Sequence, residues 1–326
     1  MHTFSIFPPQ SVQGYATFRK EVIQGLCSRH KYLNPKYFYD AIGDKLFQQI
    51  MELPEYYPTG CESDILSSQA QDIIRAIRSR TTEFDLIELG AGDATKTSFL
   101  LRELLAQGQN FTYFPVDISA SVIHSLDETL PARFPGLQYK GLQGEYMEML
   151  RVAGDLSVKP KVILFMGANI GNFHIYEALE FCREIHEHLQ PGDLFLVGFD
   201  LKKEPQIILD AYNDSQGVTK AFNLNLLHRI NQELGADFQL DRWGHFPTYD
   251  PLSGSCKSYL VSKSDQKVQI GDVTISFAAN EPIFMEISQK YTLEETKEMA
   301  LASGFRPLGN FLDSKGWFAD CLWGVE

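Results

Sequence analysis

The sequence has few of the features that build metal sites, disulfide frameworks or membrane spans. Its five cysteines include no C-x-x-C pair, and an odd number argues against a disulfide framework. There is no H-E-x-x-H pattern, so we expect no metal site. No apolar run reaches the length of about 18 residues that a membrane helix needs, and the N-terminus lacks the basic and apolar parts of an export signal. These absences indicate a cytoplasmic protein with reduced thiols.

Positive charge is also scarce. The chain has 29 Lys and Arg against 42 Asp and Glu, which gives a net charge of −13. Nucleic acids and anionic membranes bind clustered basic residues, so neither is expected as a partner. A small-molecule substrate fits better, and we expect a monomer or weak oligomer. With 326 residues, 44% of them hydrophobic, the chain can form one large domain or two unequal ones.

A glycine loop follows the short apolar run Asp85-Leu-Ile-Glu-Leu89, which we interpret as the first strand of a parallel sheet. Gly90 and Gly92 allow a sharp turn close to a ligand. A dinucleotide fingerprint, G-x-G-x-x-G, would need a third glycine where Thr95 stands. Glu88 and Asp93 make the loop acidic, which suits a ligand that has a positive centre and no phosphates. S-adenosylmethionine is such a ligand; the alternatives are an ordinary βα turn and NAD.

Two further strand ends carry groups suited to a nucleoside. The run 112–117 predicts a second strand whose last residue, Asp117, can accept hydrogen bonds from both ribose hydroxyls. After a third strand, Glu145 can supply another acceptor and Tyr146 a ring beside the adenine. We therefore expect three strand ends to converge on one cofactor.

The chain alternates short apolar runs with amphipathic segments. Strands are expected at 85–90, 112–117, 137–142, 162–165 and 194–198, and helices at 97–107, 119–128, 145–152 and 176–189. Such alternation indicates an α/β fold with a doubly wound parallel sheet, which binds its ligands at the carboxyl ends of the strands.

The pattern changes after residue 200. Residues 206–235 look helical and 237–288 look like an antiparallel meander, which indicates an inserted α+β domain. Residues 311–323 are expected to return as the last strands of the first sheet. The expected division is an N-terminal helical and aromatic segment (1–58) that joins the substrate domain, a core (59–200), the insertion (201–289) and the return to the core (290–326).

Two loops carry candidate binding groups. The loop after the fourth strand contains Asn169 and Asn172, whose amides can bond a small polar substrate, although an Asn there can also cap a helix. Tyr56 and Tyr57 lie between Pro54 and Pro58, which predicts an extended loop with paired rings that could form a lid. The alternative for these rings is core packing. A helix is expected from Glu62 onwards.

Several motifs together resemble one family. They are Tyr37-Phe-Tyr-Asp40, Leu53-Pro-Glu-Tyr-Tyr-Pro-Thr59, Glu88-Leu-Gly-Ala-Gly92, Phe165-Met-Gly-Ala-Asn-Ile-Gly-Asn172, Met285-Glu-Ile-Ser288 and Gly316-Trp-Phe318. Over nearly its whole length the chain looks like the histidine Nα-methyltransferases of the ergothioneine pathway. The resemblance implies a class I (Rossmann-like) S-adenosylmethionine enzyme that trimethylates the α-amino group of L-histidine to hercynine.

The resemblance also implies roles for individual residues. The cofactor would contact Gly90, Lys96, Asp117, Glu145 and Tyr146. Lys96 would pair with the methionine carboxylate of the cofactor, whereas the plain alternative is an exposed helix lysine. The substrate's amino and carboxylate groups would be held by Tyr56, Asn172 and Tyr212, and its imidazole by Glu286 and Ser288. Tyr39 and Phe47 would line the pocket, and Tyr39 or a bound water would take the amine proton.

One position departs from the family. Ser258 stands where the family has a methionine that packs on the imidazole, which implies a wider and more polar pocket for the side chain. The same chemistry on another amino acid, such as tryptophan, therefore stays open. Two other classes also stay open: an NAD-dependent oxidoreductase and a non-catalytic S-adenosylmethionine-binding protein.

Overall fold

The computed structural model describes residues 12–326, which divide into two compact units. The first unit comprises Pro58–Lys202 and Gln289–Glu326, and the second comprises residues 12–57 and Lys203–Ser288. Each unit has a hydrophobic core of its own. The chain therefore leaves the first unit after Lys202 and re-enters it at Gln289, so that residues 203–288 of the second unit are an insertion in the sequence of the first.

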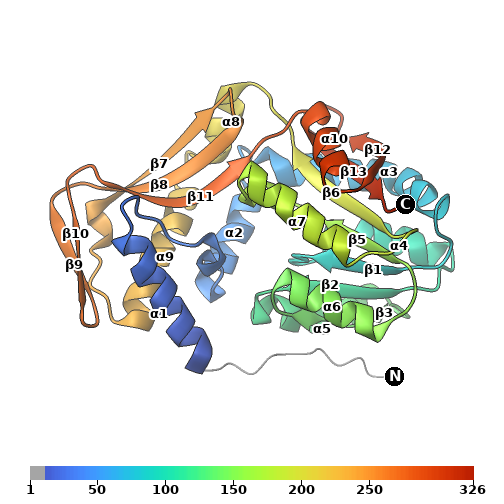
Figure 1. Cartoon of the computed structure of the whole chain (residues 1–326), viewed down its shortest axis with the longest axis horizontal. Coiled ribbons are helices and arrows are strands. Elements are labelled where there is room, and N and C mark those ends of the chain that lie inside the picture. Colours follow the sequence, from blue (N-terminus) through green and yellow to red (C-terminus); the bar gives the residue numbers. More distant parts are fainter. Residues whose placement is uncertain (1–11) are drawn as a thin grey trace. The chain divides into compact units, whose positions relative to one another are not determined.

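The first unit is built on an eight-stranded sheet in the order β12, β13, β6, β5, β1, β2, β3, with β4 also pairing with β2 (Figure 1). Its strands are β1 (Asp85–Leu89), β2 (Thr112–Asp117), β3 (Gln138–Tyr139), β4 (Leu142–Gln143), β5 (Lys161–Phe165), β6 (Leu194–Asp200), β12 (Arg306–Leu312) and β13 (Phe318–Gly324). Strands β2, β1, β5 and β6 run parallel, so their carboxyl ends share one edge. Strand β13 pairs antiparallel with β6, and β12 pairs antiparallel with β13, so the C-terminal segment returns to this sheet as predicted.

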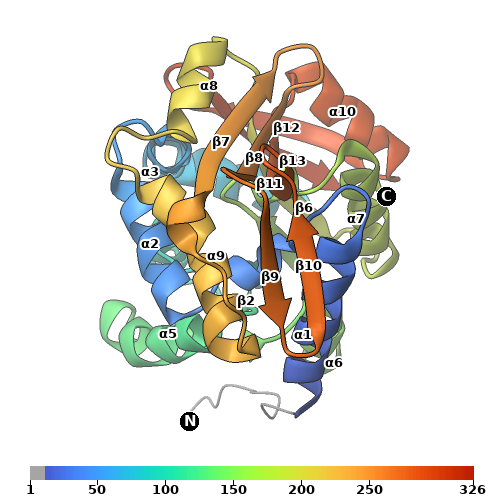
Figure 2. The same cartoon turned by 90° about the vertical axis from the view of Figure 1, so that its left-hand side faces the viewer.

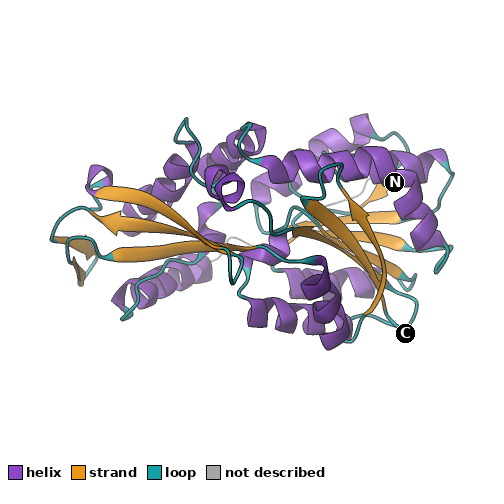
Figure 3. Cartoon of the chain, turned by 90° about the horizontal axis from the view of Figure 1, so that it is seen from above, coloured by secondary structure: helices purple, strands orange, loops and turns teal. Residues whose placement is uncertain are grey.

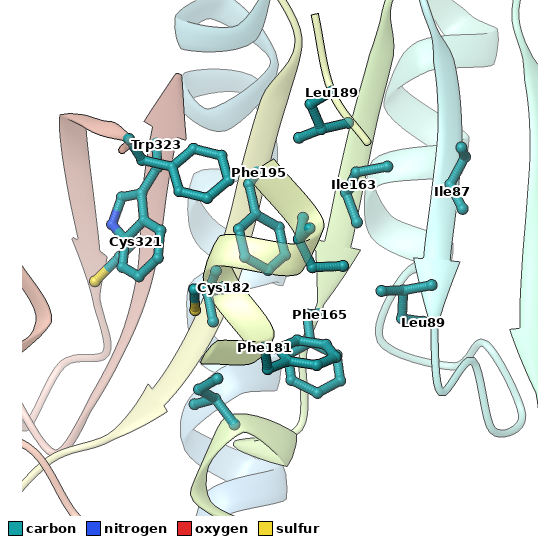
Figure 4. Close-up of a cluster of buried hydrophobic side chains, with 14 of the residues drawn as sticks. Ile87, Leu89, Ile163, Phe165, Phe181, Cys182, Leu189, Phe195, Cys321 and Trp323 are labelled. Carbon is teal, nitrogen blue, oxygen red and sulfur yellow. The ribbon is translucent and has the colours of Figure 1, made fainter. Parts of the chain in front are cut away.

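Helices cover both faces of this sheet (Figure 3). They are α3 (Tyr57–Arg78), α4 (Ser98–Ala106), α5 (Ala120–Arg133), α6 (Tyr146–Leu156), α7 (Ile175–Glu187) and α10 (Leu293–Ala302). Every residue of β1 and β6 is buried, as expected for strands covered on both sides. Figure 4 shows the resulting core, where Phe165, Phe181 and Phe195 lie among aliphatic side chains. The predicted doubly wound α/β fold is confirmed.

A buried ion pair fastens the two points at which the chain leaves and re-enters the first unit. Lys290 Nζ lies 2.6 Å from Asp200 Oδ2, and both side chains are fully buried. Beside this pair the Tyr291 N–H donates to the Asp200 carbonyl at 3.0 Å, and the Lys202 N–H donates to the Tyr291 carbonyl at 2.8 Å. The residues that precede and follow the insertion are therefore hydrogen-bonded to each other within the first unit.

The second unit combines the N-terminal segment with the insertion, and Figure 2 is turned towards it. Its helices are α1 (Val12–Cys27), α2 (Ala41–Glu52), α8 (Pro205–Ala211) and α9 (Val218–Leu234), with short 3-10 turns η1 (Pro35–Phe38) and η3 (Leu240–Arg242). Strands β11 (Pro282–Gln289), β8 (Ser255–Ser262) and β7 (Trp243–Asp250) form one sheet, and β10 (Val273–Phe277) pairs with β9 (Gln266–Ile270). The pairs β7–β8 and β9–β10 are antiparallel, as predicted, but the strands do not form one continuous meander, because β8 pairs with β11 and β9 and β10 form a sheet of their own.

The N-terminal segment joins this unit through backbone hydrogen bonds. The Leu33 N–H donates to the Phe284 carbonyl, and the Phe284 N–H donates to the Lys31 carbonyl, both at 2.9 Å. Residues 31–33 thus lie alongside β11 like a short extra strand. Because the contact is made by backbone groups, the sequence of the segment carries little sign of it.

The segment between the two prolines differs from our prediction. Pro54 and Pro58 were expected to bracket an extended loop, but α3 begins at Tyr57 and includes Pro58 in its first turn. The first turn of a helix tolerates proline, because its N–H would have no partner within the helix. The helix therefore starts five residues before Glu62, and only Tyr56 remains in the preceding loop.

The single helix predicted for residues 206–235 is two helices. Tyr212 ends α8, and α9 begins after Gly217, which has a positive φ of 75°. Asp214 fixes the break, since its carboxylate accepts hydrogen bonds from the Val218 N–H at 2.8 Å and the Thr219 N–H at 2.7 Å. A capping aspartate can start a new helix within an otherwise continuous helical pattern.

Candidate active site

The glycine loop after β1 lies against two other loops of the first unit. Gly90 has a φ of +77°, which favours glycine, and its amide donates to the Val116 carbonyl of β2 at 2.8 Å. A Cβ on Gly90 would come within 2.9 Å of Asn169 Nδ2 and 3.0 Å of the Tyr146 hydroxyl. The loops after β1 and β5 and the start of α6 therefore converge at Gly90, and any side chain there would disturb all three.

Asp117 ends β2 and organises the same loop. One carboxylate oxygen accepts from the Gly92 N–H at 3.2 Å and the other from the Ser119 N–H at 2.9 Å. An ionised carboxylate oxygen can accept more than one hydrogen bond. The half-buried position at a strand end is the one expected for the ribose acceptor.

Glu145 and Tyr146 lie where α6 begins. Glu145 is exposed and is the N-cap residue, but its side chain makes no capping hydrogen bond. The ring of Tyr146 lies edge-on to Phe165 at 5.5 Å and to Phe181 at 6.2 Å, which holds it beside β5. Burial, followed by the charges of Asp117 and Glu145, raises the pKa of the Tyr146 phenol, so this hydroxyl stays protonated.

Lys96 is not an exposed helix lysine, which was the alternative to a role in binding the cofactor. Its ammonium forms an ion pair with Glu62 of α3, and Glu62 is fully buried. Glu62 also accepts a hydrogen bond from the Gly167 N–H at 2.7 Å. Burial opposes the charge on Lys96, but the neighbouring Glu62 outweighs it and raises the pKa of the lysine. One carboxylate thus links the loop after β1 to the loop after β5.

The loop after β5 presents the two asparagines. Gly167 and Ala168 both have positive φ, and a 3-10 turn, η2 (Asn169–Asn172), follows. Asn172 is exposed at the end of the turn. The N-cap of α7 is His174, so neither asparagine has the helix-capping role that we had considered. Both amides are therefore available for other contacts at the carboxyl edge of the sheet.

In the second unit, the ring-bearing residues expected around the substrate lie together. The Phe47 ring is 5.8 Å from Tyr39, 5.9 Å from Phe222 and 6.4 Å from Tyr56, measured between ring centroids. Tyr56 lies edge-on to Tyr212 at 6.2 Å. The structure thus brings aromatic residues that are far apart in the sequence into one group. We call Tyr39, Phe47, Tyr56, Tyr212 and Phe222 the aromatic cluster.

Ser288 joins this aromatic cluster through a hydrogen bond. The Tyr212 hydroxyl donates to Ser288 Oγ at 2.6 Å. Glu286 precedes Ser288 by two residues on β11 and is half-buried, while Met285 and Ile287 on either side are buried. This alternation is the one-sided strand that the sequence predicted.

Ser258 does not lie with Glu286. The rings of Tyr259 and Phe284 are 5.8 Å apart, so these two residues share a face of the three-stranded sheet. Residues two apart on a strand share a face and neighbours do not, which puts Glu286 on the face of Phe284 and Ser258 on the other one. Ser258 is buried, and its Oγ has no hydrogen-bond partner within residues 12–326. The expected combination of Ser258 and Glu286 in one pocket is therefore not formed within this sheet.

Comparison with known proteins gives the family. Residues 18–325 match the family described as "Histidine-specific methyltransferase, SAM-dependent". The chain is 35% identical to the histidine N-alpha-methyltransferase of Mycolicibacterium smegmatis, over 92% of each chain. It belongs to this family.

Two further relatives support the assignment of this methyltransferase. It is 33% identical to the histidine N-alpha-methyltransferase of Mycobacterium tuberculosis over 94% of each chain. It is 26% identical to ergothioneine biosynthesis protein 1 of Schizosaccharomyces pombe, over 84% of this chain and 36% of that longer one. The cofactor is S-adenosyl-L-methionine.

The residues present at the carboxyl edge fit that cofactor. Gly90 leaves a cradle that a single Cβ would fill, Asp117 offers carboxylate acceptors, and Lys96 offers a cation. A nucleoside with a sulfonium and an amino-acid end needs these three kinds of group. The individual contacts remain predictions.

Sequence reasoning missed two members of these clusters. Glu62 lies on the buried stripe of α3 with Ile65 and Leu66, and a carboxylate in that stripe was the available signal. Phe222 contacts Phe47 and Tyr39, but it was counted only as part of a helical run. An apolar ring on a helix gives no sign of its partners when they are distant in the sequence.

Glu88 has a different environment from the one that we expected. We counted it as a charge of the glycine loop, but it is buried on β1 and accepts hydrogen bonds from the hydroxyls of Thr97, at 2.5 Å, and Tyr113. Burial raises its pKa from 4.5 to about 7, although both hydrogen bonds act to lower it. Its carboxyl group therefore belongs to the interior of the sheet.

This raised pKa predicts a dependence of stability on pH. Because the folded state keeps the Glu88 proton up to about pH 7 while the unfolded state releases it near 4.5, the free energy of unfolding should fall across this range. Glu88 should contribute about 3 kcal/mol to this loss, and Glu88→Gln should remove that contribution. Urea unfolding at about pH 5 and about pH 8 measures the difference between wild type and variant. Glu83→Gln, an exposed control, should keep the wild-type dependence, and an unchanged dependence in Glu88→Gln would contradict the assignment.

Proposed function

We propose that this methyltransferase transfers methyl groups from S-adenosylmethionine to the α-amino group of free L-histidine. The product is N,N,N-trimethylhistidine, an intermediate of ergothioneine biosynthesis. The family and the two mycobacterial relatives, which are named for this reaction, support the proposal. The experiment below distinguishes this proposal from two alternatives, a non-catalytic S-adenosylmethionine-binding protein and a tryptophan methyltransferase.

The observation that carries the proposal is the joining of the aromatic cluster to Ser288. Tyr56 and Tyr212 bring two phenol groups close together, and Tyr212 is bonded to Ser288 on the strand that also carries Glu286. Phenol hydroxyls can bond the amino and carboxylate groups of an amino acid, and a carboxylate with a serine hydroxyl can bond the two nitrogens of an imidazole. This set of groups matches histidine from end to end.

In this proposal the protein contributes mainly by positioning. S-adenosylmethionine supplies a methyl group on a sulfonium, which is already a good leaving group. The chain has to hold an uncharged amine about 3 Å from that methyl and in line with the sulfur, which accounts for a large part of the barrier. Asn172 and the two tyrosines hold the amine and carboxylate, and Tyr39 or a bound water takes the proton that the amine must lose.

The test is methyl transfer to a panel of free amino acids. Purified protein is supplied with S-adenosylmethionine and each of the twenty amino acids, and S-adenosylhomocysteine formation and product mass are followed. Histidine should give a product carrying three added methyl groups, and tryptophan should give none. Cofactor binding without any amino-acid-dependent turnover would indicate the non-catalytic alternative, and a melting shift with NADH alone would indicate the oxidoreductase.

Two variants examine the substrate contacts. Glu286→Ala should raise the KM for histidine by about 10-fold or more, because a charged acceptor of the imidazole is lost. Asn172→Ala should lower kcat/KM by a similar factor through poor placement of the amino group. Glu294→Ala, in an exposed ion pair with Lys297, is the charge-matched control and should leave both constants unchanged. Full activity of either site variant would remove the role assigned to that residue.

We also propose that the protein acts in the cytoplasm on a small-molecule substrate, as a monomer or weak oligomer. Within residues 12–326, which contain all five cysteines, no disulfide is formed, which fits a reducing compartment. Within residues 12–326 there is no helix of the length and hydrophobicity needed to cross a membrane.

A further inference from the structure

Glu62 occupies a cavity that one glycine leaves open. The side chain reaches from α3 towards β6, where a Cβ on Gly198 would come within 2.6 Å of Glu62 Oε1. The same oxygen accepts the Gly167 N–H, and the other oxygen pairs with Lys96. Both oxygens of Glu62 are therefore engaged by donors.

Asp320 lies directly beside this position. It is paired with Gly198 in the register of β13 and β6, and its side chain is fully buried. Neither of its oxygens accepts a hydrogen bond from an N–H or O–H group of residues 12–326. Opposite residues of an antiparallel pair point their side chains to the same face of the sheet, and a Cβ on Gly198 would lie 2.6 Å from Glu62 Oε1, so the carboxyl group of Asp320 lies next to that of Glu62. Two carboxyl groups hydrogen-bond to each other only when one of them carries a proton.

The charges around Asp320 lead to the same conclusion. The groups that act on it are Glu62 and Lys96, and Glu88 is a further neighbour of Lys96. The single ammonium of Lys96 compensates Glu62, so an ionised Asp320 would be a second, uncompensated charge in the interior. Such a charge is costly, and buried groups neutralise instead. Burial and the charge of Glu62 raise the pKa of Asp320 well above its ordinary value.

We propose that Asp320 is a neutral carboxylic acid that donates its proton to Glu62, and that this carboxylic acid–carboxylate pair is a positioning device for the cofactor end of the sheet. Glu62 in turn holds the Lys96 ammonium and the Gly167 N–H, which belong to the loops after β1 and β5. Neither acidic residue touches the cofactor in this scheme. The second part of the proposal rests on the proposed function, because it assigns Lys96 to the cofactor's carboxylate.

Infrared spectroscopy tests the proton directly and needs no cofactor. Wild-type protein near neutral pH should show the carbonyl stretch of a buried carboxylic acid, and the difference spectrum against Asp320→Asn should contain this band. Because Glu88 is a second buried carboxyl group with a pKa of about 7, both proteins also carry Glu88→Gln, which removes its contribution from the difference spectrum. A difference spectrum without the band, or with carboxylate bands in its place, would overturn the proposal whether or not the protein is a histidine methyltransferase.

Binding of S-adenosylhomocysteine tests the positioning. In Asp320→Asn the amide N–H can donate to Glu62 as the acid does, so the Kd should stay within about 3-fold of wild type. Asp320→Leu fills the same space without a donor, leaves Glu62 short of one hydrogen bond, and should raise the Kd by about 10-fold. Equal affinities in wild type and Asp320→Leu, or equal losses in Asn and Leu, would contradict the proposal. No binding by any protein, wild type included, would instead contradict the proposed function.

Discussion

Replacing Asp117 with alanine should lower the affinity for S-adenosylhomocysteine by about 100-fold or more. The carboxylate is proposed to accept hydrogen bonds from the ribose hydroxyls, and bonds to a charged acceptor contribute about 1.5–3 kcal/mol each. The same carboxylate accepts the Gly92 N–H and the Ser119 N–H, so its removal also loosens the glycine loop. Isothermal titration calorimetry measures the change in Kd.

Two controls separate these contributions. Asp117→Asn keeps a neutral acceptor and should fall between wild type and alanine. Asp155→Ala, in an exposed ion pair with Arg151 on α6, removes the same charge and should bind as wild type does. An Asp117→Ala protein that binds within about threefold of wild type would show that the ribose is held elsewhere.

The sheet of the first unit could be predicted because its strands are buried on both sides. Such strands read as short apolar runs, and the predicted limits of 112–117 agree with β2. The weakest prediction was the strand at 137–142, which is two strands of two residues each, β3 and β4. They pair with opposite ends of β2, and between them the Lys140 N–H donates to the Tyr113 carbonyl at 2.9 Å. A strand that is interrupted after two residues leaves no clear pattern of hydrophobicity.

The cofactor edge was predictable in part. Gly90 and Asp117 lie at the ends of strands, so their sequence positions place them at the carboxyl edge of the sheet. The structure places Gly90 next to Tyr146, which agrees with the expected convergence of strand ends. The partner of Lys96 was not predictable in this way. Glu62 comes from a helix that precedes the first strand, and it reaches the edge only because Gly198 leaves space for it. Contacts of this kind depend on tertiary packing rather than on spacing.

The structure of the second unit was less predictable from its sequence. Its aromatic cluster draws on residues from 39 to 222, and no periodic pattern connects positions so far apart. Here the resemblance to a family supplied the residues, and the structure then showed that Tyr39, Phe47, Tyr56, Tyr212 and Ser288 are contiguous within one unit. The same information placed Ser258 with Glu286, and strand alternation separates them.

The buried pair of Asp200 and Lys290 supports the second large prediction. Lys290→Met removes the ammonium but keeps a flexible chain of similar length, so the fully buried Asp200 loses the cation that lies 2.6 Å from its Oδ2. Breaking such a pair costs about 3–5 kcal/mol, because the remaining carboxylate has lost its compensating charge. We therefore expect the free energy of unfolding in urea to fall by about this amount.

Two comparisons show whether the charge itself is responsible. Lys297→Met breaks an exposed ion pair with Glu294 and should cost no more than about 0.5 kcal/mol. Adding Asp200→Asn to Lys290→Met should recover part of the lost stability, because the uncompensated carboxylate is then neutral. A double variant as unstable as the single one would indicate that packing, and not charge, stabilises the two points at which the chain leaves and re-enters the first unit. Recovery would instead show that the ion pair holds together the two points at which the chain leaves and re-enters that unit.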